Sequence, residues 1–207
     1  MPDRHKLATV CQRARATRRR MLHSSRRSFV QSVAWLPTLL VPSVAQATLM
    51  RGLKLRDLTA RSQHVLLLTP LASQCTSVAL GGRQVIVTDT SVRVDDVIER
   101  ARPSSSTLVV RTLGGIQNGA GLLVHGQAEL SIGAACVAFL TSSSDGRLWV
   151  TGMAQGHFPL ENSAKERYLK QSPRLPELLD FEHSGVRALV GRGLTEARQL
   201  VHEAATR

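Results

Sequence analysis

Aromatic residues are scarce in this chain of 207 residues: two Trp, one Tyr and four Phe make up 3% of it. This scarcity argues against a single-stranded nucleic-acid binder, because such proteins stack bases on aromatic side chains. Cysteine is rarer still, with three residues, no CxxC pair and no Cys/His spacing typical of a zinc site. The histidines occur singly, without an i,i+4 pair. We therefore predict no metal site.

The positive charge of the chain is concentrated near its N-terminus. Of the net +12, residues 1–47 carry +8, from nine Lys and Arg against one Asp, and residues 48–207 carry +4. A net charge of +4 on 160 residues is ordinary for solubility and is not the footprint of a protein that follows phosphates. The sequence therefore predicts no nucleic-acid partner, and the basic excess belongs to a leader.

Residues 1–47 are predicted to be a signal peptide. A pair of arginines precedes a moderately apolar stretch, residues 28–44, and two small residues follow where a signal peptidase reads the chain. A membrane span needs roughly 20 apolar residues, whereas this stretch is shorter and is interrupted by Pro and polar residues. We therefore do not expect it to be a membrane anchor. The predicted cleavage residues are Ala45, Ala47 and Thr48. We expect a periplasmic or extracellular protein without a transmembrane anchor after cleavage.

The start of this signal resembles the twin-arginine export motif. The motif has a Ser, two Arg, a spacer and a Phe, here Ser25, Arg26, Arg27 and Phe29. The sequence departs from the motif two residues later, where a Gln replaces the common Lys. Because residues 1–20 would make an unusually long basic region, Met21 is an alternative start. A buried amphipathic helix and a basic nucleic-acid-binding arm are the competing interpretations.

Two cysteines, Cys75 and Cys136, remain in the expected mature chain. An even number in an oxidising compartment is typical of a disulfide, and closing a loop of about 60 residues would stabilise the fold by roughly 4 kcal/mol. Cysteine is also a good small buried apolar residue, and Cys136 lies in the apolar run 134–140. The sequence leaves both alternatives open.

The mature chain is predicted to be mainly β, with a short helix before the strands and another at the C-terminus. Three leucines among charged residues, Leu53, Leu55 and Leu58, indicate the first helix. Apolar runs and period-two alternation bounded by turn residues predict six strands, at residues 64–71, 85–97, 107–113, 122–130, 134–141 and 148–153. This pattern favours a small five- or six-stranded OB-like barrel.

After the strands the pattern becomes irregular. Scattered prolines and charges in residues 159–193 predict an extended segment with one further strand at 186–190. Residues 195–205 predict a helix with Thr195 as N-cap and an apolar stripe facing the core. We infer one domain after the signal, with the barrel at 48–158, an irregular extension at 159–193 and a packed helix at 194–207.

The glycines at 114–121 do not form a recognisable nucleotide-binding loop. No GK[ST] follows them, and Gly119 and Gly121 precede apolar residues rather than the third glycine of a dinucleotide loop. A turn or bulge is the favoured interpretation, and we predict no cofactor.

Other candidates for catalysis have simpler structural explanations. Asp95, Asp96 and Glu99 belong to a predicted strand, whose neighbouring side chains point to opposite faces, so they are expected to face solvent rather than form an acid/base pair. Residues 142–146 predict a turn rather than a catalytic serine, and residues 153–157 predict a strand end that meets a tight turn.

Three short motifs stand out in residues 53–158: RTLGG at 111–115, GAG at 119–121 and VTGMAQG at 150–156. Through them these residues are similar to a group of uncharacterised exported bacterial proteins, which in turn resemble the netrin/metalloproteinase-inhibitor type of five-stranded OB barrel. The resemblance implies the barrel fold but no activity for particular residues. Inhibitors of that type use an N-terminal Cys exposed by signal cleavage, whereas this chain would begin at Thr48.

Three functional classes follow from the sequence. The first is a non-catalytic exported module that binds a protein, a peptide or a component of the cell envelope. The second is a secreted hydrolase whose site is assembled from distant residues such as His125, Glu129 and His157. The third, an oligonucleotide binder, is suggested by the expected barrel alone, which is an argument by analogy. We favour the binding module over an enzyme.

Overall fold

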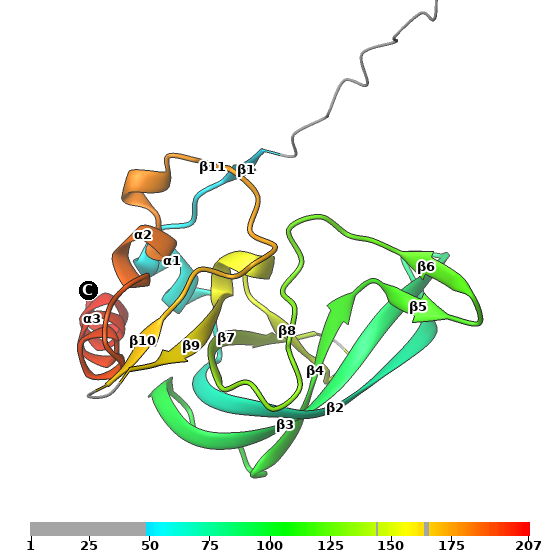
Figure 1. Cartoon of the computed structure of the whole chain (residues 1–207), viewed down its shortest axis with the longest axis horizontal. Coiled ribbons are helices and arrows are strands. Elements are labelled where there is room, and N and C mark those ends of the chain that lie inside the picture. Colours follow the sequence, from blue (N-terminus) through cyan, green and yellow to red (C-terminus); the bar gives the residue numbers. More distant parts are fainter. Residues whose placement is uncertain (1–48, 144, 164–165) are drawn as a thin grey trace, which may run out of the picture. The chain divides into compact units, whose positions relative to one another are not determined.

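The computed structural model of the chain describes residues 49–143, 145–163 and 166–207, which belong to one unit, residues 44–207 (Figure 1). The predicted export motif (Ser25, Arg26, Arg27 and Phe29) and the predicted cleavage residues (Ala45, Ala47 and Thr48) lie outside the described residues. Among the helices in the described part, none is long and apolar enough to cross a membrane.

A seven-stranded sheet dominates this unit, so the mainly β prediction is confirmed. Its order is β10-β9-β7-β2-β3-β4-β8, and β8 also pairs with β7. The pairing of β4 with β8 is parallel and the other pairings are antiparallel. The strands are β2 (His64–Leu80), β3 (Arg83–Arg100), β4 (Thr107–Leu113), β7 (Cys136–Ser142), β8 (Leu148–Val150), β9 (His157–Asn162) and β10 (Arg167–Leu169).

Two short strand pairs, the first parallel and the second antiparallel, and three helices complete the described part. The minor sheets pair β1 (Met50–Arg51) with β11 (Leu178–Leu179), and β5 (Gly115–Gln117) with β6 (Ala120–Leu122). The helices are α1 (Leu55–Ala60), α2 (Gly185–Leu189) and α3 (Leu194–Thr206), and 3-10 turns occupy Met153–Gly156 and Phe181–His183. The predicted N-terminal and C-terminal helices are thus confirmed.

Two apolar cores lie on opposite faces of β2 and β7. Alternate side chains of β2 separate between them: Val65 and Leu67 pack with the helices, and Leu66 and Leu68 pack with β3, β4 and β8. On β7, Phe139 belongs to the first core, where its ring meets Phe158 edge-on at 5.9 Å. Burial on both faces explains why these strands have unbroken apolar runs instead of a period-two alternation.

Helix α3 is held against β3 by two of the carboxylates that were predicted to lie in a strand, Asp96 and Glu99. Arg198 donates to Asp96 at 2.6 Å and to the carbonyl oxygen of Val97 at 2.8 Å. His202 Nδ1 lies 2.9 Å from Glu99 Oε2. These carboxylates therefore fix the C-terminal helix to the sheet, a structural role.

Four details of the predicted secondary structure are wrong. The segment 159–193 is not irregular throughout, because most of β9 and all of β10 lie in it and belong to the main sheet. Residues 186–189 belong to α2 rather than to a strand, because Ser184 Oγ accepts from the Arg187 backbone N–H and caps a helical turn. Helix α3 begins at Leu194 after Gly193, so Thr195 is inside the helix and is not its N-cap. Most of residues 122–130 is irregular, since Gly126 adopts a φ of 76° that no strand accommodates.

Candidate binding site

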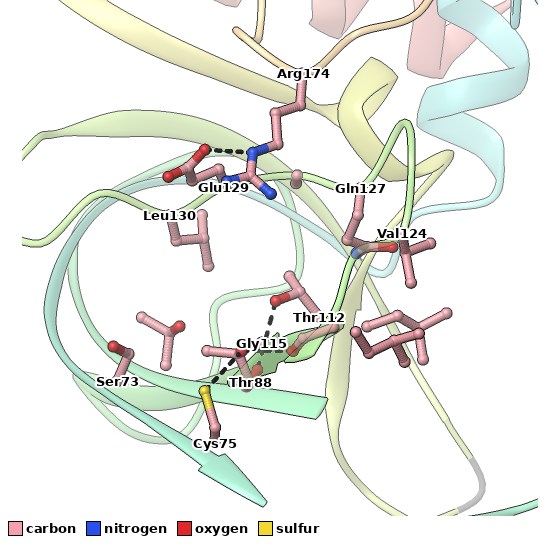
Figure 2. A pocket seen from close by; sticks show the side chains of 15 residues that line it. Ser73, Cys75, Thr88, Thr112, Gly115, Val124, Gln127, Glu129, Leu130 and Arg174 are labelled. Atoms are coloured by element: carbon pink, nitrogen blue, oxygen red, sulfur yellow. Dashed lines mark hydrogen bonds and ion pairs between the residues drawn. The ribbon is translucent and has the colours of Figure 1, made fainter. Parts of the chain in front are cut away.

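A cavity of about 280 Å³ lies against β2, β3 and β4 where the chain leaves β4 for the β5–β6 hairpin. Its floor carries small polar side chains from β2, β3 and β4, and the segment 124–130 with Arg174 forms the opposite wall (Figure 2). The floor residues are Ser73, Cys75, Thr88, Thr90 and Thr112.

The sheet register brings the floor residues together. Cys75 lies opposite Thr88, which in turn lies opposite Thr112 on β4, and Ser73 lies opposite Thr90. Directly opposed residues share one face of a sheet, so their hydroxyl and thiol groups converge on the cavity. Sequence reasoning missed this set, because no local spacing reveals that residues from three strands meet.

Glycine at 114 and 115 is required by the geometry of the floor. Gly115 has a φ of 131°, and a Cβ there would lie 2.6 Å from both Cys75 Sγ and Thr88 Oγ1. Gly114 has a φ of 95°, and its carbonyl oxygen accepts from Thr88 Oγ1 at 2.7 Å. These two residues are the glycines of the RTLGG match, and they let the chain cross closely over the floor.

The hydrogen bonds of Thr88 also assign a role to the Cys75 thiol. The single hydroxyl hydrogen of Thr88 is donated to Gly114, so the hydroxyl oxygen is left as an acceptor toward Cys75 Sγ at 3.4 Å. The thiol is therefore the donor in this contact. The floor thus has one ordered polar chain from Cys75 through Thr88 to Gly114.

An ion pair stands on the other side of the cavity. Arg174 Nε lies 2.6 Å from Glu129 Oε2, and both side chains are nearly half exposed. Figure 2 shows the pair across from Ser73, Cys75 and Thr88. The two charged groups are accessible, so a bound molecule with its own charge can exchange partners with them.

The β5–β6 hairpin places apolar side chains beside this polar floor. Ile116 is 74% exposed and Leu123, just beyond the hairpin, is 63% exposed. Leu122 and Val124 both line the cavity. The site therefore combines a hydrogen-bonding floor with an exposed apolar edge.

The residues considered for a hydrolase are not gathered in this cavity. Glu129 lines it and is paired with Arg174. His125 is exposed and is not part of the lining, and His157 is buried with its Nδ1 3.0 Å from Ser172 Oγ. Burial lowers the pKa of His157 to about 4, which keeps it neutral near pH 7. His157 thus fills a core position.

The cysteines are both free thiols in the described residues, so the disulfide between Cys75 and Cys136 is not formed. Cys136 lies opposite Leu68, seven residues along β2 from Cys75. At about 3.3 Å per residue, this separation far exceeds the roughly 7 Å between Cα atoms that a disulfide tolerates. Cys136 is instead a buried member of the second core, and burial raises the pKa of its thiol to about 12.

A buried arginine supports the sheet beside the floor. Arg111 of β4 donates two hydrogen bonds to Asp89 of β3, both at 2.7 Å, and a third to Asp145 at 3.1 Å. The hydrogen bond from Arg111 lowers the pKa of the Asp89 carboxyl against the opposing effect of burial. Arg111 is the first residue of the RTLGG match, and its partner on another strand was not visible in the sequence.

The residues described contain no group of three or more His, Cys, Asp or Glu side chains that could hold a metal ion. A comparison of the chain with protein-family models found no match, and a comparison with curated proteins found none either.

Proposed function

We propose that this chain is an exported, non-catalytic binding module whose ligand is a protein or peptide segment that occupies the cavity and the β5–β6 hairpin. One observation carries the proposal: Leu122 and Val124 line the same cavity as the floor of hydroxyl groups, and Ile116 and Leu123, in and just after the same hairpin, are exposed. Peptide segments offer backbone hydrogen-bonding groups together with apolar side chains, and this pair of surfaces suits both.

We further propose that five of the strands form an OB-type barrel. Three antiparallel pairings connect β7, β2, β3 and β4 in order, and a parallel pairing adds β8 to β4. The antiparallel pairing of β8 with β7 then joins the two ends of the series. A second core of alternate side chains lies on the face that these strands share. Such closure is how small antiparallel barrels avoid open edges, and cavities at their ends commonly bind ligands.

The relationship to netrin/metalloproteinase-inhibitor-like proteins is part of the same proposal. It is supported by the strand pairings and by the structural roles of Gly114, Gly115 and Arg111 within the matched segments. The relationship concerns the barrel and not inhibition.

Export is tested by the mass of the intact protein recovered from the periplasm or medium of its host. We expect a species that begins at Thr48, which corresponds to removal of residues 1–47 as a twin-arginine signal. Recovery of only the full-length chain from the cytoplasm would refute the export proposal.

Binding is tested by placing a photo-crosslinking amino acid at Leu123, beside the cavity, and exposing the protein to an extract of the host envelope. The matched control carries the same group at Ser104, an exposed residue between β3 and β4. We expect one recurrent adduct, identified by mass spectrometry, from the Leu123 position alone. Equal adducts from both positions, or none, would contradict a binding site at this cavity.

A further inference from the structure

Among the residues that the structure describes, one long edge of the main sheet has no strand paired to it. Residues 64–68 of β2 pair with both β3 and β7, whereas residues 72–80 pair with β3 alone. Within the described residues, no turn or loop backbone hydrogen bond reaches residues 72–80 either. This unpaired edge of nine residues, the β2 edge, extends for about 30 Å and presents free backbone N–H and C=O groups.

The β2 edge lacks the features by which proteins usually protect such edges. Its sequence, ASQCTSVAL, contains no charged residue and no proline. By contrast, the strand at one end of the same sheet, β10, is only three residues long, begins with Arg167 and is followed by Lys170. Short length and charge are protective, so the contrast marks the β2 edge as a surface that accepts a strand.

We propose that the strand accepted by the β2 edge is the same edge of a second copy of this chain, in an antiparallel pair about a two-fold axis. Identical edges meet without like-charge repulsion only where they carry no charge, and residues 72–80 satisfy this condition. A two-fold pair is therefore compatible with the composition along the whole edge.

The ends of the β2 edge also complement each other. Antiparallel pairing brings the beginning of the edge in one copy beside its end in the other. Leu71 and Ile132 are exposed at the beginning, where the Gly133 backbone N–H donates to the Pro70 carbonyl oxygen at 2.8 Å. Val78 and Leu80 stand at the end. In the antiparallel pair, the apolar ends of one β2 edge thus lie beside the apolar ends of the other, and the polar centres of the two edges lie beside each other.

This pairing has a consequence for the cavity. Ser73 and Cys75 belong both to the β2 edge and to the cavity floor. A two-fold axis perpendicular to a sheet preserves its faces, so the two floors become one continuous surface on the same side of the dimer. Dimerisation does not depend on the ligand proposed above, because the edge pairs through backbone groups.

The test measures the molar mass of the purified protein by light scattering during size exclusion over a range of concentrations. We expect a monomer that converts to a dimer as concentration rises, since an interface built on one strand edge is small. Ser77→Lys places a charge near the centre of the β2 edge, and we expect it to weaken the dimer roughly tenfold or more. Ser104→Lys makes the same change at an exposed position away from the edge and should leave the dimer unchanged.

Amide hydrogen exchange of the unmodified protein provides a second measurement that needs no variant. Alternate amides within residues 72–80 should exchange more slowly at dimer-forming concentrations than at dilution. A monomer at every concentration, a dimer that survives Ser77→Lys, or equal loss of the dimer in both lysine variants would overturn the proposal. The proposal would also be overturned if the exchange rates in residues 72–80 did not change with concentration. It would equally be overturned if the only strand found at this edge were an extended peptide of another protein.

Discussion

Acidification should destabilise this protein through His157. The side chain of His157 is 2% exposed, its Nδ1 lies 3.0 Å from Ser172 Oγ, and burial lowers its pKa from 6.5 to about 4. Because the folded-state pKa lies below the unfolded value, the unfolded chain takes up the proton first as pH falls. The stabilising effect of neutral His157 is complete above about pH 6.5 and is lost as the pH decreases toward about 4.

The size of the effect follows from the pKa difference. The free energy of unfolding should decrease by about 2 kcal/mol between pH 7 and pH 5, and by about 3 kcal/mol at pH 4, from this residue alone. Urea unfolding at a series of fixed pH values measures this decrease.

His157→Asn is the control, because the Asn amide retains a polar group close to the position of Nδ1 but does not titrate. The smaller side chain should cost about 1 to 3 kcal/mol at pH 7 through the space it leaves. Acid protonation of Asp89, Asp96 and Glu99, whose pKa values are lowered by their hydrogen bonds with Arg111, Arg198 and His202 respectively, affects both proteins and cancels in the difference. Parallel pH profiles for the two proteins would refute the role of His157.

Three further perturbations test the structure around the cavity. Asp89→Ala should destabilise the fold by about 3 kcal/mol in urea unfolding, because it leaves the buried Arg111 guanidinium without its bidentate partner. Gly115→Ala should cost about 2 kcal/mol or more, since the new Cβ clashes with the floor and the φ of 131° is unfavourable for Ala. In the native protein a thiol reagent should modify Cys75 and spare Cys136 until unfolding, because Cys136 is buried and its pKa is raised to about 12.

Each of these perturbations has a matched control. Asp145→Asn removes the more exposed partner of Arg111 and should cost less than about 1 kcal/mol. Gly119→Ala also replaces a glycine of positive φ, but nothing lies within 4 Å of its Cβ, so only the backbone cost of about 1 kcal/mol is expected. Peptide mapping after labelling separates the cysteines, and equal modification of Cys75 and Cys136 in the folded protein would contradict their different environments.

Local sequence patterns predicted the elements whose burial and conformation depend on near neighbours. The run at 64–71 and the alternation at 85–97 lie in β2 and β3, and the stripe at 195–205 lies in α3. The failures occurred where a local signal was ambiguous. The apolar residues within 186–190 are compatible with a strand or a helix. The hydrogen bond from the Arg187 N–H to Ser184 Oγ caps the segment and favours the helix α2.

The sequence by itself determined that this part of the chain is mainly β with a helix at each end, because apolar period and turn residues act over short distances. Only the tertiary structure decided that Cys75, Thr88 and Thr112 lie side by side and that Arg111 forms an ion pair with Asp89. It also decided that the two cysteines are too far apart to bond. Those relations depend on the register of strands that are remote in sequence, and no local pattern specifies a register between distant strands.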